Sequence, residues 1–161
     1  MTTLTIGPDR QAIVTTLWTP FYESSGVPAA VRDGDVLRAT GHTGEDEDLT
    51  FSADAAHQIR RTFVNLGGTL QEAGFAWADV VELRSFHVGL RDQAEALQAI
   101  ADEFLGRPLP AWTAVGVPEL SDEGSVIEMS CTAVRQGTEG RASSARRSRP
   151  DTRAISSFTT R

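Results

Sequence analysis

The chain has 161 residues, of which 40% are hydrophobic, and this length and composition fit one compact domain with its own core. All 15 positively charged residues are arginines, so there is no lysine to form a Schiff base and covalent pyridoxal phosphate chemistry is excluded. Residues 1–135 hold nine arginines against 20 acidic residues, a net charge of −11, which argues against nucleic-acid binding by the folded part.

Targeting signals and metal-ligand patterns are both missing from the sequence. The first residues lack the basic start and apolar run of a signal peptide, and no stretch reaches the roughly 18 apolar residues that span a bilayer, so we expect a cytoplasmic protein. Cys131 is the single cysteine and lies on an apolar strand face, where packing is its expected role. The histidines, His42, His57 and His87, are too scattered to predict a metal site.

The N-terminal part of the chain gives weak signals. Residues 1–24 are interpreted as an extension with two short strands, over 4–6 and 12–18, and Pro20 ends the second. Residues 21–28 are rich in Gly, Pro and Ser and predict a loop.

Two predicted strands, over 29–31 and 36–40, flank a tight turn in which Asp33-Gly34 supplies the positive φ. The second of them runs into a segment bounded by glycines at 41–44. The four acids at 45–48 predict a solvated loop, with a metal site as the less favoured alternative.

Two amphipathic helices follow, with a strand between them. The first opens near Ser52 and ends at Gly74, a residue typical of helix C-termini. The strand is expected over 78–88 and the second helix over 92–105. The apolar stripes are Ala55, Ala56, Ile59, Phe63, Leu66 and Leu70 in the first helix and Ala94, Leu97, Ile100, Ala101 and Phe104 in the second.

The strand at 78–88 has no cleanly polar face. Alternation predicts burial of both of its faces, and therefore an oligomer. One face carries Val80, Glu82, Arg84 and Phe86, and the other carries Val81, Leu83, Ser85 and His87.

The last two predicted strands, over 110–117 and 125–134, are joined by a turn-rich link at 118–124. Glu128 falls on the polar face of the second strand, opposite an apolar face that belongs against a core. Its spacing alone favours a solvated glutamate over one that meets a ligand, and leaves both open. In the first strand one face carries Trp112, Ala114 and Gly116.

The order of elements is therefore β-β-α-β-α-β-β, with room for one more strand in front. It predicts an α+β fold in which two helices cover one face of a mixed sheet. Residues 137–161 are rich in Arg and Ser and almost without apolar side chains, which predicts a disordered tail; a basic arm that touches an acidic neighbour or nucleic acid is the alternative.

Several short motifs, in this order and spacing, resemble the Rid (YjgF-like) family over residues 26–134. The resemblance implies a chorismate-mutase-like α+β fold for residues 25–136, and a homotrimer whose sheets surround a central barrel with three clefts between subunits. The matching segments are Ala30–Val36, Thr40-Gly41, Asn65-Leu66, Ala73-Gly74, Ala78–Val81, Pro110-Ala111 and Ile127-Glu128.

The resemblance also implies a chemistry without a cofactor, the hydrolysis of reactive enamines and imines to 2-keto acids and ammonia. Glu128 matches the family glutamate that activates water, and Gly41 matches the glycine that helps to position substrate. Trp112 stands where these proteins carry a carboxylate-binding arginine, and Val27 where many have a tyrosine. With Ala114 nearby, Trp112 would shape a larger and less polar pocket, suited to an aromatic or cyclic imine.

Four further residues are candidates for substrate contacts on the same resemblance. Arg84 shares the barrel-facing side with Glu128, where an intersubunit ion pair is slightly favoured over an anion site. The other three are His42 after Gly41, His87 at the end of its strand, and Gln98 on the second helix.

These features leave three functions open. Hydrolytic deamination of an imine or enamine in an intersubunit cleft, with Glu128 moving the proton, is the leading interpretation. A cyclase or tautomerase using the same carboxylate is the second. The third is a trimer that binds a small molecule or partner without turnover.

Overall fold

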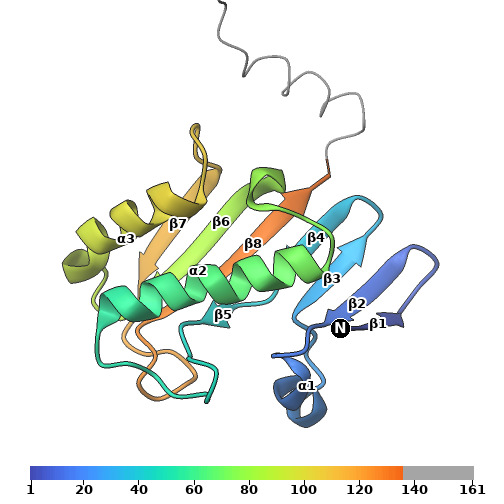
Figure 1. Ribbon diagram of the computed structural model, residues 1–161, viewed down its shortest axis with the longest axis horizontal. Coiled ribbons are helices and arrows are strands. Elements are labelled where there is room, and N and C mark those ends of the chain that lie inside the picture. The colour runs from blue at the N-terminus through green and yellow to red at the C-terminus, as the bar shows by residue number, and fades with distance from the viewer. Residues whose placement is uncertain (136–161) are drawn as a thin grey trace, which may run out of the picture.

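The computed structural model describes residues 1–135, which fold as one mixed sheet with two long helices on one face (Figure 1). The predicted tail at 137–161 lies outside the described residues. Within the described range, no helix is long and apolar enough to cross a membrane. The strands are β1 (Thr2–Thr5), β2 (Arg10–Val14), β3 (Ala30–Asp33), β4 (Val36–Ala39), β5 (His42–Thr43), β6 (Val80–His87), β7 (Ala111–Gly116) and β8 (Ile127–Val134). The helices are α1 (Thr19–Ser25), α2 (Ala55–Glu72) and α3 (Leu90–Phe104), with a 3₁₀ turn at Trp77–Asp79.

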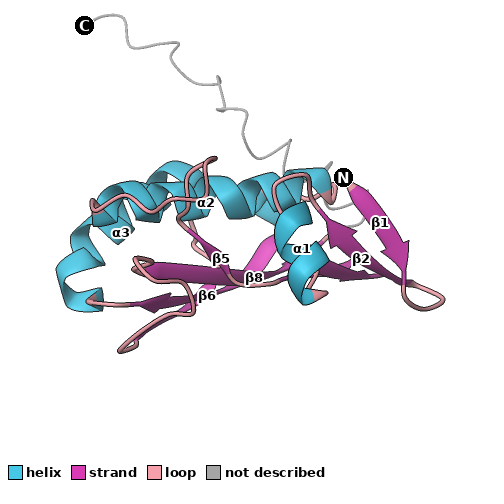
Figure 2. Cartoon of the chain, turned by 90° about the horizontal axis from the view of Figure 1, so that it is seen from below, coloured by secondary structure: helices cyan, strands magenta, loops and turns pink. Residues whose placement is uncertain are grey.

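The strands follow the order β1-β2-β3-β4-β8-β6-β7, and β5 pairs with β8. All pairs are antiparallel except β6 with β7, which are joined by α3 and run parallel. Strands β7 and β8 are consecutive in sequence, but β6 lies between them. The mixed α+β architecture with two helices over one face is as predicted from the order of elements (Figure 2).

The prediction of a loop over 21–28 is wrong, because α1 occupies Thr19–Ser25. Pro20 lies in the first turn, where its missing N–H is not needed, and Gly26 ends the helix with φ +73° and an N–H bond to the Tyr22 carbonyl. Pro20, which was predicted to end a strand, therefore lies at the start of a helix of seven residues, and Gly26, one of the residues that predicted the loop, ends it. The strand predicted before it is also shorter, ending at Val14.

The core lies between the sheet and the pair α2 and α3. Phe63 at the middle of α2 is fully buried and stacks on Phe104 of α3, with ring centroids 5.1 Å apart. The predicted apolar face of β8 is confirmed, because its alternate residues are buried against these helices. Buried beneath the helices are Leu37, Leu83, Ile127, Met129, Cys131 and Ala133. Burial raises the pKa of the Cys131 thiol to about 12, in keeping with a packing role.

The opposite face of β4, β6, β7 and β8 carries no helix within residues 1–135, as Figure 2 shows from the side. In a single chain one face of β6 is thus buried and the other open, so burial of both faces, which requires association, stays a prediction. Val81 and Val115 are exposed and lie at the β6–β7 edge of the sheet. The open face carries charged, polar and aromatic side chains: Arg38, Glu82, Arg84, Phe86, Glu128, Ser130 and Thr132.

Phe63→Ala tests the core between α2 and the sheet. Loss of a fully buried ring should lower the free energy of unfolding by about 3–5 kcal/mol. Its neighbour Val64 is 43% exposed on the same helix, so Val64→Ala should change it by less than about 0.5 kcal/mol. Urea denaturation measures both, and similar losses would contradict this placement of the core.

Candidate functional site

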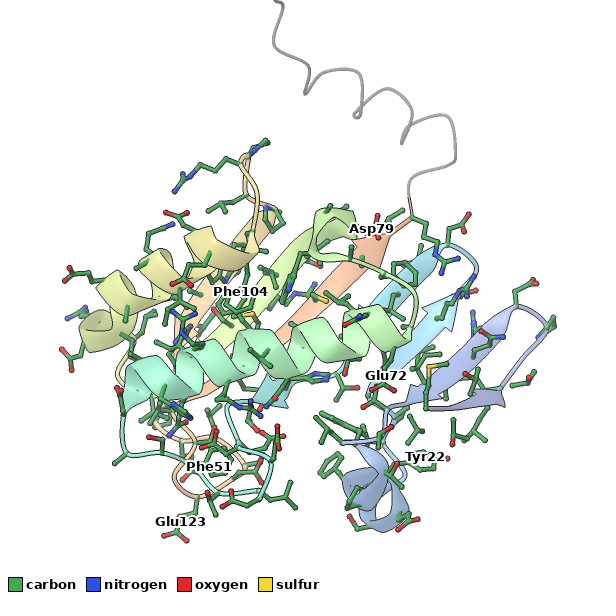
Figure 3. All side chains as sticks on the ribbon, in the orientation of Figure 1. Tyr22, Phe51, Glu72, Asp79, Phe104 and Glu123 are labelled. Atoms are coloured by element: carbon green, nitrogen blue, oxygen red, sulfur yellow. The ribbon has the colours of Figure 1, made fainter. Side chains whose placement is uncertain are left out.

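A pocket of about 420 Å³ lies where α1, the segment 40–51, the loop after β7 and the start of β8 come together. This volume is in the range of small-molecule sites. Phe51 and the loop around Glu123 lie side by side in Figure 3, and a Cβ at Gly124 would come 3.6 Å from Phe51 Cβ. The lining consists of Leu17, Trp18, Pro20, Phe21, Ser24, Thr40, Gly41, Thr43, Glu45, Leu49, Phe51, Ser121, Asp122 and Glu128.

Glu128 is the chemical centre of this pocket. Its side chain is half-buried, and its carboxylate has neither a hydrogen bond nor an ion pair with any group of residues 1–135. Burial, and secondly the negative charge of Asp122, raise the pKa of this carboxyl group above its usual range. A carboxyl group that is free, accessible and more basic than usual can accept and return a proton.

Gly41 and Glu128, matched separately by the resemblance, are in contact. A Cβ at position 41 would come 2.8 Å from Glu128 Cγ and would overlap the carboxylate. The carboxylate can lie against this backbone only because Gly41 has no side chain.

A buried amide holds the outer loops of the pocket together. Gln58 of α2 donates to the carbonyls of Ser52 (2.7 Å) and Gly124 (2.8 Å) and accepts from the N–H of Val126 (2.9 Å). The segment before α2 and the loop before β8 are therefore fixed to the same side chain. Gly44 passes close to the Gln58 backbone and leaves no room for a side chain.

The aromatic wall of the pocket comes from α1, which the sequence analysis missed. Trp18 donates from Nε1 to the Val27 carbonyl (2.9 Å), and its ring lies 4.5 Å from the ring of His42 and 5.2 Å from that of Phe21. A tryptophan and a phenylalanine three residues apart, on either side of a helix-starting proline, are the signal that could have revealed this wall.

His42 supports the wall from behind and does not line the 420 Å³ pocket. Because the Thr40 carbonyl can only accept, His42 Nδ1 donates to it (2.8 Å), and Nε2 accepts from the Thr69 hydroxyl (2.8 Å). Burial lowers the pKa of His42 to about 4, so the ring is neutral at physiological pH.

Trp112 lies on the other face of the sheet from Glu128. It is in register with Leu83 beneath the helices, and its Nε1 donates to the Ser85 hydroxyl at 2.9 Å. Ala114 follows on the same strand face and is exposed. In a single chain neither residue reaches the pocket that holds Glu128.

A buried hydrogen-bond network runs from Trp112 through Ser85 and His87 to Gln93. The Ser85 hydroxyl donates to His87 Nε2 (2.8 Å), and His87 Nδ1 donates to Gln93 Oε1 (2.8 Å). The order resembles a serine–histidine pair, but Ser85 is fully buried and its oxygen already accepts from Trp112. Burial lowers the pKa of His87, so this is a neutral core network.

Arg84 and Gln98 also lie outside the pocket. Arg84 is on the same sheet face as Glu128, as expected, and pairs there with Glu82 at 2.8 Å. Gln98 is exposed on α3 and bonds to Asp102 at 3.1 Å. Within residues 1–135 no group of histidine, cysteine and acidic side chains is arranged to hold a metal ion.

Comparisons with known proteins give a consistent picture. The family described as Endoribonuclease L-PSP matches residues 25–135. The chain is 39% identical over 101 residues to the RutC family protein YjgH of Escherichia coli, covering 62% of this chain and 77% of that protein. A solved structure of protein YjgH is similar with a TM-score of 0.72 and 33% identity, covering 81% of this chain and 99% of that one.

Two further solved structures support the fold alone. A YjgF-family protein from Mycobacterium tuberculosis has a TM-score of 0.68 at 24% identity, covering 78% of this chain and 99% of its own. RidA from an Antarctic Psychrobacter has a TM-score of 0.66 at 23% identity, covering 82% and 99%.

Two glycine substitutions separate the roles of the backbone around the pocket. In Gly41→Ala the new methyl group meets a side chain that can rotate, so stability should fall by less than about 1 kcal/mol while the carboxylate moves away. In Gly44→Ala it would lie 2.8 Å from the Gln58 Cα in α2, which cannot rotate, so the loss should be about 1–3 kcal/mol. Equal losses in urea denaturation would show that Glu128 is locked in place.

Glu128→Gln should stabilise the protein at pH 7–8 and have little effect below about pH 4. The folded pKa of Glu128 is raised, so the wild type loses stability as the pH rises from the unfolded pKa through the folded one, whereas glutamine has no proton to lose. Thermal unfolding between pH 4 and pH 8 measures this difference, with Glu123→Gln in the exposed loop as the control. A stabilisation that does not vary with pH would contradict titration of the Glu128 carboxyl group as its cause.

Proposed function

Because the chain belongs to the Endoribonuclease L-PSP family, which includes the YjgF, RidA and RutC proteins, we propose that it hydrolyses a reactive imine or enamine in the pocket around Glu128. The observation that carries the proposal is the free, half-buried carboxylate with a raised pKa against Gly41. An acid–base group of this kind needs no cofactor to transfer protons.

The proposed reaction uses Glu128 as a proton carrier. An enamine first moves its N–H proton to carbon and so becomes the imine. Water adds to the carbon of the C=N bond, and Glu128 takes a proton from that water and passes it to the nitrogen, giving a carbinolamine. Glu128 then takes the proton of the carbinolamine hydroxyl and delivers it to the amino group, which leaves as ammonia while the C=O bond forms, so Glu128 returns to its starting state. The raised pKa brings the carboxyl group closer to neutral pH, where accepting and returning a proton are both easier.

The proposed active form is a homotrimer in which the open sheet faces surround a central barrel. Support comes from the uncovered face of β6, β7 and β8 and from its exposed valines, Val81 and Val115. Glu128 emerges on this same face, so association would bring a neighbouring subunit close to its carboxylate. In that arrangement Trp112 and Ala114 of the edge strand β7 and Gln98 of α3 would border the cleft of another subunit, while Arg84 keeps its ion pair with Glu82.

A cyclisation or tautomerisation is the second candidate, and the apolar rim of the pocket favours it. Leu17, Phe21 and Leu49 are 62%, 49% and 62% exposed around the opening, and a bound ligand that covers them would exclude water. The same carboxylate would then move a proton between two positions of one substrate.

A binding protein without turnover is the third candidate, supported by Trp112 at the position of the usual arginine. Ribonuclease activity is not carried over from the family's name, since the described pocket lining has three acids and no basic side chain.

Glu128→Gln tests the proposal directly. It keeps the shape of the side chain but cannot take up a proton, so ammonia release from imines generated in situ by an amine oxidase should fall at least about 100-fold. Glu123→Gln removes an equal charge from the neighbouring exposed loop and should keep full activity. Sedimentation of both variants checks that the assembly persists. An active Glu128→Gln trimer would refute the role of Glu128, and a stable wild-type monomer would refute the intersubunit site.

A further inference from the structure

The ionisable side chains that line the pocket all have the same sign. Glu45, Asp122 and Glu128 contribute carboxylates, and among the described residues no arginine or histidine reaches the lining. A carboxylate-bearing ligand needs a cation or several N–H donors to offset its desolvation, and the described side chains of this lining supply neither. A positively charged ligand, in contrast, would find carboxylates in this lining to pair with.

Two of these three carboxylates are available to a ligand. Glu45 accepts a hydrogen bond from the Thr43 hydroxyl. Asp122 and Glu128 have no ion pair or side-chain hydrogen bond within residues 1–135, and Asp122 acts on Glu128 as a like charge that raises its pKa. A cation placed between them would relieve this repulsion.

The rest of the lining suits an apolar or aromatic body. Trp18, Phe21 and Phe51 present rings to the pocket, and Trp18 is held by its bond to Val27 and by the His42 ring behind it. Aromatic rings attract cations through their faces and pack against other rings. Because His42 is buried and neutral, it adds no positive charge to this wall.

From these observations we infer that the pocket selects a cationic ligand, a protonated amine or iminium with a body about the size of one aromatic ring, over the anionic imino acids that an arginine would bind. The nitrogen lies toward Asp122 and Glu128, and the ring lies against Trp18 and Phe21. The inference rests on the proposed function only for the location of the site.

Three ligands of the same size but different charge test this inference on the full-length protein: benzylamine, benzyl alcohol and benzoate. At pH 7.5 benzylamine should bind at least about tenfold more tightly than the other two, and added salt should weaken it. Calorimetry gives the affinities. Tryptophan fluorescence, with Trp18→Phe to identify the responding residue among the three tryptophans, locates the ligand.

Charge-removing variants locate the nitrogen. Asp122→Asn and Glu128→Gln should each lower the affinity for benzylamine about three- to tenfold and leave that for benzyl alcohol unchanged. Glu123→Gln, one residue from Asp122 on the exposed loop, should leave all three affinities unchanged. Benzoate binding as tightly as benzylamine, as it would if a neighbouring subunit supplied an arginine, would overturn the inference.

Failure of this inference and failure of the proposed function give different results. If Glu128→Gln kept its deaminase activity while benzylamine remained the preferred ligand, the catalytic role of Glu128 would be refuted and the ligand class would stand. If benzoate were preferred while Glu128→Gln lost activity, the carboxylate would be catalytic and the ligand class would be wrong.

Discussion

A single buried amide, that of Gln58, holds together two of the loops that line the site. It satisfies two carbonyls and one N–H from loops that are far apart in sequence, and it does so from the side of α2 that also carries the core. A carboxylate could accept but not donate, and an aliphatic side chain could do neither, so glutamine meets this demand in both directions. The position of Phe51, Asp122 and the start of β8 around the pocket therefore depends on the packing of the helix layer.

Alternation along single strands predicted much of the fold and part of the site. In β8 it separated the buried side chains from Glu128, and the resemblance added Gly41, which the structure brings against that carboxylate. The alternation of side chains within one strand does not tell which of its two faces lies on the same side of the sheet as a given face of another strand, because this depends on the register between strands. Trp112 is in register with Leu83 and not on the side of Glu128. Helix α1 was missed because seven residues between a proline and a glycine carry too little apolar periodicity.

Two independent features of the chain support the inference that its site does not suit an anionic ligand. The sequence has a tryptophan where the resemblance predicts an anion-binding arginine, and the structure places that indole in a neutral network with Ser85. The pocket, on the other face of the sheet, collects carboxylates and aromatic rings. The missing arginine at position 112 and the carboxylates of the pocket both argue against a negatively charged substrate. The role of Trp112 in an assembled cleft stays a prediction.

The position of β7 has a consequence for how the protein behaves when dilute. This strand ends the strand order and bonds to β6 on one side, so among the described residues its outer row of main-chain amides and carbonyls is unpaired. Such a row can add a strand from another chain, and β7 has no charged side chain or proline to prevent it. If the protein forms the proposed trimer, dilution would separate its subunits and expose this edge together with the open sheet face, and the separated subunits would aggregate. Solubility after dilution would then depend on the proposed trimer more than on the fold of a single chain.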